Sequence, residues 1–142
     1  ISINDADRPL YHASSVLACG YLTALLKGVV DIWQGMGFTQ EEALAAIYPL
    51  SRATLKNVVK NGVAAGATGP VMRADSGTIK NHIQALSQSN PELIPVYRAL
   101  AQSSLHIAEL KGIDEPGLQE MRAVLDGFIS ETRGSQARMP PS

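Results

Sequence analysis

The first helical segment constrains this fold more than any other part of the sequence. Between Pro9 and Leu26 the chain is uncharged apart from His12. Apolar side chains recur there at three- and four-residue steps, and small residues fill most of the other positions. This spacing predicts one long helix over Arg8–Met36, and a helix that is apolar or small on nearly every side is normally buried on several sides. We therefore expect an all-α bundle of five to six helices built around one long buried N-terminal helix.

The same segment is long enough to raise the question of a membrane span. Hydroxyl side chains at Ser14, Ser15 and Thr23 interrupt it, and the periodic pattern continues through the charged pair Lys27 and Asp31. These features favour a buried helix of a soluble protein, with no membrane partner. The chain opens Ile1-Ser2-Ile3 with no initiator methionine, basic segment or cleavage-site pattern, which we interpret as a fragment or a trimmed product.

The composition is typical of one globular domain. The chain has 142 residues, of which 45% are hydrophobic and 18% charged, and a chain of this length can bury a core without a disulfide or a metal. The net charge is −1 and no stripe of Lys or Arg appears, so the basic face that a nucleic acid requires is missing. The single cysteine, Cys19, lies in an apolar run, which favours a buried side chain and a cytoplasmic protein.

Caps and helix breakers divide the rest of the chain. Thr39 and Glu42 fit a capping box whose helix runs to about Tyr48, and Pro49 should force a kink or a restart. Glycines at 37 and 62 are stop signals. Further helices are expected over Leu50–Lys60, over Gly77–Gln88 after a cap at Asp75 or Ser76, from the Asn90 cap and Pro91 to Gly112, and over Glu115–Glu131 after Asp114.

Apolar residues recur at helical spacing in these segments, and no segment has the pattern of a strand. The side chains expected to point inward are Leu50, Ala53, Leu55, Val58 and Val59, and in the last helix Leu118, Met121, Leu125, Phe128 and Ile129. Ile79, Ile83 and Leu86 share one face of their helix, and the apolar residues that extend the next helix to Gly112 are Leu93, Val96, Leu100, Leu105 and Leu110.

The sequence contains no motif that identifies a particular catalytic or binding activity. No glycine-rich turn joins a strand to a helix, and no phosphate loop or paired-cysteine zinc site is present. His12, His82 and His106 are far apart and lack the spacing of metal ligands, so no metal site is expected.

One segment departs from the needs of a plain bundle, the connection Gly62–Asp75. It contains Gly69 and Pro70 and is longer than most links between packed helices. Long structured loops are disproportionately functional. Arg73 and Asp75 carry opposite charges two residues apart, so they could serve a site or could tie the loop to a neighbouring helix.

Several short motifs together resemble a known domain. They are Tyr11-His12-Ala13, Pro49-Leu50, Thr54-Leu55, Asn57, Thr68-Gly69-Pro70, Arg73, Asp75 and His82. In order and spacing they resemble the helical C-terminal domain, of uncharacterised function, in a family of predicted Rossmann-type NAD(P)-dependent oxidoreductases. The resemblance spans about Leu10–Leu110. Members of that family tend to carry an asparagine where this chain has Cys19-Gly20, which bears on the substrate and on activity itself.

The resemblance implies an architecture and a site. Such domains are similar to the C-terminal domains of 6-phosphogluconate dehydrogenase, β-hydroxyacid dehydrogenases and pyrroline-5-carboxylate reductase. They follow a Rossmann domain that binds NADP or NAD. They dimerise through their long helices and form one wall of the substrate cleft. His12 falls roughly where β-hydroxyacid dehydrogenases place a catalytic lysine. The resemblance thus implies hypothetical catalytic roles for His12 and Asn57, and substrate binding by Thr68, Gly69, Pro70, Arg73, Asp75 and His82.

Together these expectations define one hypothesis and one alternative. The hypothesis is a helical dimerisation and substrate-cleft domain over residues 1–133 with a disordered tail over 134–142, inactive by itself because the Rossmann domain and its cofactor are outside this chain. The parent oxidoreductase would act on a small polar metabolite, anchored by Arg73. The alternative is a stand-alone helical self-association module without a catalytic role. A cleft wall requires Arg73, His12 and Asn57 to converge on one open pocket, whereas a pure interaction module leaves them scattered or paired internally.

Overall fold

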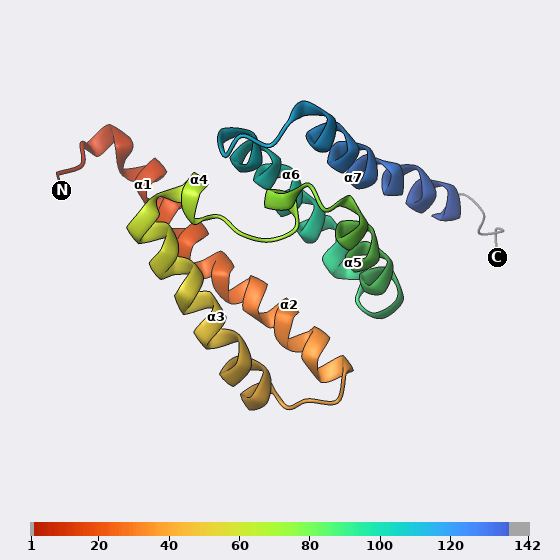
Figure 1. Ribbon diagram of the computed structural model, residues 1–142. Coiled ribbons are helices and arrows are strands. Elements are labelled where there is room, and N and C mark those ends of the chain that lie inside the picture. Colours follow the sequence, from red (N-terminus) through yellow and green to blue (C-terminus); the bar gives the residue numbers. More distant parts are fainter. Residues whose placement is uncertain (1, 137–142) are drawn as a thin grey trace. The chain divides into compact units, whose positions relative to one another are not determined.

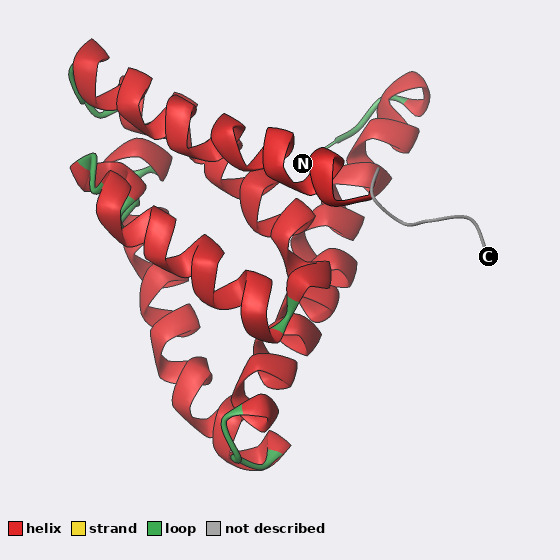
Figure 2. Cartoon of the chain, turned by 90° about the vertical axis from the view of Figure 1, so that its right-hand side faces the viewer, coloured by secondary structure: helices red, strands yellow, loops and turns green. Residues whose placement is uncertain are grey.

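The structure is a computed structural model that describes the backbone of residues 2–136 and the side chains up to residue 127. Throughout these residues the chain forms helices joined by turns and loops, and no strand occurs among them (Figures 1 and 2). The all-α class is therefore confirmed. The chain divides into two compact units, Ile1–Ile47 and Tyr48–Ser142.

The first unit contains the long N-terminal helix, which is interrupted once. After a 3-10 turn, η1 (Asp5–Asp7), it comprises α1 (Arg8–Ser15), a π-helical turn η2 (Val16–Gly20) and α2 (Tyr21–Gly35). In the π turn the backbone N–H of Tyr21 donates to the carbonyl of Val16, five residues back. The predicted helix is thus present, and the periodicity missed the extra residue that the π turn accommodates, a feature often found at functional sites.

The expected burial of this helix is wrong. Of its residues only Gly28 and Val30 are buried, and Cys19, expected inside, is exposed. The side chain of Leu10 is 74% exposed and that of Leu17 is 65% exposed. By length and composition the stretch Asp5–Gly35 also qualifies as a possible membrane span, and only 11% of its most apolar part is buried within the chain.

Gly37 ends α2 as predicted. Its φ of 95° is in the left-handed region that favours glycine. The Gly37 N–H donates to the Gln34 carbonyl and the Phe38 N–H donates to the Trp33 carbonyl. The ring centroids of Phe38 and Trp33 are 5.0 Å apart. This combination is the Schellman motif with its hydrophobic contact, which satisfies carbonyls that the helix end would leave free.

The next helix, α3 (Gln40–Asn61), begins at the predicted capping box. The Glu42 N–H donates to Thr39 Oγ1, and the Thr39 N–H donates to a Glu42 carboxylate oxygen at 2.8 Å. Of the kink or restart expected at Pro49, the restart is wrong, because the helix continues through it. Pro49 removes one N–H bond to the Ala45 carbonyl, and since Ala45 is exposed, water can satisfy that carbonyl. The two units divide within this helix.

In the second unit, α3 does not bury the face that its pattern suggested. Leu50, Leu55 and Val59 were expected to point inward, and all three side chains are exposed. Ala53 is exposed too, so Val58 alone of the residues expected inside is half-buried. Burial depends on which elements come together, and helical periodicity alone does not specify that.

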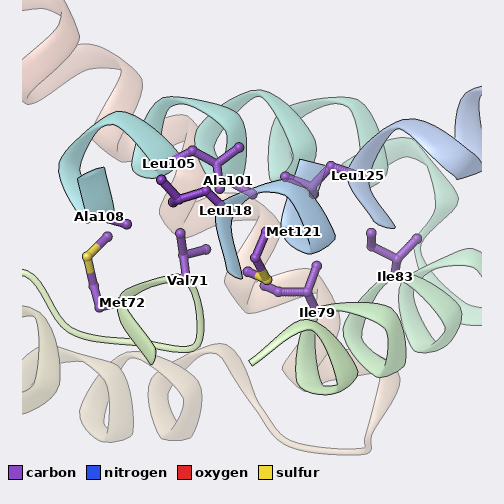
Figure 3. Packing of buried hydrophobic residues seen from close by; sticks show 10 residues of the cluster. All are labelled: Val71, Met72, Ile79, Ile83, Ala101, Leu105, Ala108, Leu118, Met121 and Leu125. Atoms are coloured by element: carbon purple, nitrogen blue, oxygen red, sulfur yellow. The ribbon is translucent and has the colours of Figure 1, made fainter. Parts of the chain in front are cut away.

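The core of the second unit lies between three later helices, α5 (Ser76–Ser89), α6 (Ile94–Leu110) and α7 (Glu115–Gln136), and a 3-10 turn, η3 (Val71–Arg73). Figure 3 shows how the buried side chains of these four elements pack together. The buried residues are Val71, Met72, Ile79, Ile83, Ala101, Leu105, Ala108, Leu118, Met121 and Leu125. All members of the cluster on α5 and α7 were predicted from the sequence.

The third contributor, α6, buries one of the apolar residues that predicted the helix, Leu105, together with two alanines. Its buried residues are Ala101, Leu105 and Ala108, whereas Leu100 and Leu110 are exposed. Small alanines on the inner face let neighbouring elements approach closely, and this face is not the one with the largest apolar residues. Phe128 and Ile129 were predicted inside, but their side chains lie outside the described residues.

The remaining helix ends agree with the sequence in part. Asp75 caps α5 as predicted, and Asp114 Oδ1 accepts the Gly117 N–H at the start of α7. Asn90 occupies the predicted N-cap position before Pro91, but it caps a 3-10 turn, η4 (Pro91–Leu93), that precedes α6, and no backbone N–H donates to its side chain. The backbone of α7 extends to Gln136, beyond the expected end at Glu131. Residues 137–142 of the predicted tail lie outside the described residues.

Candidate functional site

The connection from α3 to α5 begins with a closely packed turn. Gly62, with a φ of 83°, is followed by the short helix α4 (Val63–Gly66). A Cβ on Gly66 would lie 2.8 Å from the Cα of Val58, so only glycine allows the two backbone segments to approach this closely. Asn57 Nδ2 donates to the Gly66 carbonyl at 2.8 Å and its Oδ1 accepts from Asn61 Nδ2 at 2.6 Å. The Asn57 side chain therefore braces the connection.

A second bond holds the next carbonyl of the same segment. Lys111 Nζ, just after the C-terminus of α6, donates to the carbonyl of Ala67 at 2.7 Å. Gly69 then turns the chain with a φ of 105°, which an L side chain would strain. The loop between Ala67 and α5 is thus fixed at its first residue by α6.

The end of the connection is strained at Ala74 and secured by Asp75. Ala74 has a φ of 49°, in the left-handed region that non-glycine residues seldom adopt, and such strain clusters at functional or tightly determined positions. The Asp75 carboxylate accepts the Thr78 N–H at 3.0 Å and the Thr78 hydroxyl at 2.7 Å. These two hydrogen bonds from Thr78, aided by the charges of Arg73 and His82, lower the pKa of Asp75 below its ordinary value of 3.8. Asp75 therefore ties the loop to α5.

A pocket of about 280 Å³ opens beside this loop within the second unit. Four of its lining residues lie on one face of α6, at steps of three and four residues, and the others come from the loop, η3 and α5. The lining residues are Thr68, Pro70, Val71, Met72, Ile79, Tyr97, Leu100, Ala101 and Ser104. None of them is charged, and three carry hydroxyl groups.

One titratable pair adjoins the pocket. His82 Nδ1 lies 2.8 Å from the hydroxyl of Tyr97, and the two rings meet edge-on at 84°. Which of the two groups donates the proton depends on the histidine tautomer. Burial raises the pKa of Tyr97 above its ordinary value of 10, so the phenol stays protonated at neutral pH.

The sequence-predicted site residues are distributed unequally around this pocket. Thr68 and Pro70 line it, and His82 reaches it through Tyr97. Gly69 lies between the first two, whereas Asn57 and Asp75 are engaged in bonds that hold the loop. Arg73 is exposed, is absent from the pocket lining and forms no ion pair with another described residue. His12 is exposed on α1, in the other unit.

Seven of the pocket residues were not singled out as site residues from the sequence, among them the four on α6: Tyr97, Leu100, Ala101 and Ser104. Their common helical face was a usable signal, because two small residues flanked by two larger ones leave a depression on a helix. The metal-ligating side chains of the described residues form no group of three or more that could hold an ion.

Comparisons with known proteins give one match. The family model described as a domain of unknown function (DUF2520) matches residues 1–104. No curated protein matches the chain, and no solved structure matches it. The matched range covers the N-terminal helix, the α3–α5 connection and most of α6, so it includes the pocket.

Proposed function

Because this chain belongs to the DUF2520 family, a family of unknown function, we propose that it is the helical self-association and substrate-cleft domain of an NAD(P)-dependent oxidoreductase-like protein. The parent protein acts on a small polar metabolite in the cytoplasm, without nucleic acid or membrane partners. The oxidoreductase part of this proposal rests on the resemblance of the short motifs to such proteins. The self-association part rests on the exposed apolar surface of the N-terminal helix.

The exposed surface of that helix is the observation that carries the proposal. Leu10, Leu17 and Tyr21 are more than half exposed, on a helix with almost no buried residue. Exposed apolar patches of this kind mark interaction surfaces, because covering them with protein removes apolar area from water.

The polar groups of the helix are compatible with a protein partner. Ser14 and Ser15 donate to the Tyr11 carbonyl, and Thr23 donates to the Cys19 carbonyl. Lys27 and Asp31 pair with each other at 2.5 Å. Because these three hydroxyls and two charges are already partnered within the helix, a second copy could cover them without leaving their donors unpaired.

The pocket beside the loop supports the cleft-wall part of the proposal. Thr68 and Pro70, which belong to the substrate-binding set implied by the resemblance, line it. Arg73 lies in the same 3-10 turn as the lining residues Val71 and Met72 and has no ion-pair partner among the described residues. A free guanidinium at that place would suit an anionic part of a substrate. A proton-transfer role for His12 remains part of the same proposal.

The described residues of this chain do not fit a dinucleotide. A Rossmann site holds the pyrophosphate at a glycine-rich turn between a strand and a helix, and the described residues contain no strand. NADP or NAD would therefore be held by the separate N-terminal domain of the parent protein.

The alternative function is a helical self-association module without a catalytic role. One observation favours it: Asn57 is bonded internally to Gly66 and Asn61, and neither Asn57 nor Arg73 lines the pocket. The two functions share the self-association surface and differ in whether the pocket is used.

Sedimentation velocity on paired variants tests the self-association. Leu17→Glu places a charge on the N-terminal helix, and Leu110→Glu makes the same change at the end of α6; the two leucines are 65% and 66% exposed. We expect the first variant to be a monomer and the second to associate like the unchanged chain, because a buried unpaired charge is costly. Equal behaviour of the two variants would refute the assignment of the surface. So would flotation of the unchanged chain with phosphatidylcholine vesicles, which would indicate that lipid covers the helix.

The oxidoreductase part has a separate test in the gene. The reading frame upstream of the codon for Ile1 should encode a strand followed by a glycine-rich turn and a helix. An upstream frame that is closed, or that encodes no such pattern, would leave the stand-alone module as the better account.

A further inference from the structure

We propose that the pocket beside η3 is a binding site for a small uncharged hydrocarbon group that carries one hydroxyl or carbonyl. Its role as part of a substrate site rests on the proposed function, whereas the binding itself is a property of the second unit alone. Three features of the pocket support this binding: its size, the absence of charge in its lining and the hydrogen bonds of its hydroxyl groups.

The size of the pocket follows from the α6 face beneath it. Ala101 and Ser104, one helical turn apart, are small, and the larger Tyr97 and Leu100 flank them. The volume is about 280 Å³, whereas an apolar cavity of about 150 Å³ already holds benzene. The pocket therefore has room for a six-membered ring or a short branched chain with one substituent.

The lining selects against charge. Val71, Met72 and Ile79, which are buried core residues, form part of its wall, and no lining side chain is ionisable near neutral pH. A carboxylate or an ammonium group buried against this lining would lose hydration without meeting a counter-charge in the lining itself, because Arg73 lies outside it. An uncharged apolar group gains from the same transfer.

The three hydroxyls of the lining favour one polar group on the ligand. Ser104 Oγ donates its proton to the Leu100 carbonyl at 2.8 Å, so its oxygen can only accept a further bond. The Tyr97 hydroxyl is paired with His82. The Thr68 hydroxyl forms no hydrogen bond with another described residue and can both donate and accept. A ligand hydroxyl or carbonyl at this place would therefore find a partner.

Benzyl alcohol is a suitable probe, because it combines an apolar ring with one hydroxyl. Titration into the full ¹⁵N-labelled chain should give saturable shifts of backbone amide resonances around residues 68–72, 79 and 97–104. A dissociation constant on the order of 1 mM is reasonable for a ligand of so few atoms. Benzoate and benzylammonium, which keep the ring but add a charge, should bind at least ~5-fold more weakly because of their desolvation cost.

Two adjacent serines provide a matched pair of variants. Ser104 lines the pocket, and Ser103 next to it is exposed outside it; each donates to the carbonyl four residues back. Ser104→Leu should fill the pocket and weaken benzyl alcohol binding at least ~10-fold, whereas Ser103→Leu should leave it unchanged. Thr68→Val, on the exposed loop, should weaken binding roughly 3-fold or more by removing one hydrogen bond.

Each unfavourable outcome has a defined meaning. Shifts that do not saturate, equal losses for the two serine variants, or tighter binding of a charged analogue would each overturn the proposal. If Ser104→Leu does not fold, unchanged binding by Thr68→Val would overturn the hydroxyl contact. Self-association is measured separately by sedimentation, so a failure of this inference leaves the self-association test of the proposed function unaffected, and the reverse also holds.

Discussion

At the scale of single residues, the connection between α3 and α5 is held by a few well-defined contacts. Asn57 and Lys111 bind the consecutive carbonyls of Gly66 and Ala67. Asp75 secures the other end by capping α5. These bonds explain how a connection without long regular structure keeps one conformation and shapes the pocket next to it.

The close approach at Gly66 leads to a stability prediction. Gly66→Ala should lower the free energy of unfolding by about 1–3 kcal/mol, because the new Cβ would meet backbone atoms that cannot move aside. Its nearest neighbours would be the Cα and N of Val58, at 2.8 and 3.0 Å. Urea denaturation measures the change. Gly77→Ala is the control: its Cβ would have one ordinary contact, at 3.8 Å, so it should be neutral or stabilising.

The lowered pKa of Asp75 leads to a prediction about acid. A carboxyl group with a lower pKa in the folded chain contributes stability above its ordinary value of 3.8, and that contribution is lost as the pH falls through the lowered pKa. Asp75→Asn keeps a capping oxygen but cannot ionise. It should melt at a lower temperature than the unchanged chain at pH 7, and the difference should disappear near pH 2. A difference that persists at pH 2 would mean that the carboxylate charge is not what stabilises the cap.

At the scale of elements, helix ends were predictable and buried faces were only partly so. The capping box at Thr39, the glycine stop at Gly37 and the Asp75 cap depend on neighbours within a few residues, so the local sequence specifies them. The core faces of α5 and α7 were also correct, because each has one apolar face. On α3 only Val58 of the residues predicted inside is half-buried, and on α6 Leu105 is buried whereas Leu100 and Leu110 are exposed, because each helix carries large apolar residues on more than one side.

The pocket illustrates the same limit. Thr68 and Pro70 were found through a resemblance, whereas Tyr97 and Ser104 lie on a helix with no motif and become site residues only because η3 packs against α6. The spacing of these residues on one helical face can be read from the sequence, but the tertiary contact that turns that face into a pocket cannot. The π turn at Val16–Gly20 was missed for a related reason, since one extra residue barely alters the apolar spacing.

The continuity of α3 through Pro49 leads to a prediction for that element. Proline inside a helix removes a hydrogen bond and crowds the preceding turn. Pro49→Ala should therefore raise the free energy of unfolding by roughly 1–3 kcal/mol, measured by urea denaturation. Pro91→Ala is the matched control: Pro91 lies at the first position of η4, where the missing N–H has no helical partner, so little gain is expected. An equal gain for both variants would mean that Pro49 does not perturb α3.

At the scale of the whole molecule, the described residues form a packed core in the second unit and leave apolar side chains of the N-terminal helix exposed. The core cluster belongs entirely to residues 71–125, whereas the helix from Arg8 to Gly35 is mostly exposed. A soluble chain seldom leaves so much apolar surface open to water. The N-terminal helix therefore needs a partner that covers its apolar surface, and the proposed partner is a second copy.

The mass of the unchanged chain in solution tests this claim most directly. Light scattering after size-exclusion chromatography, with the protein at roughly tens of micromolar and without detergent, should give twice the chain mass of 15.1 kDa. On dilution the mass should fall toward that of one chain, as mass action requires. A mass of one chain at every concentration, with the protein folded and soluble, would contradict the account.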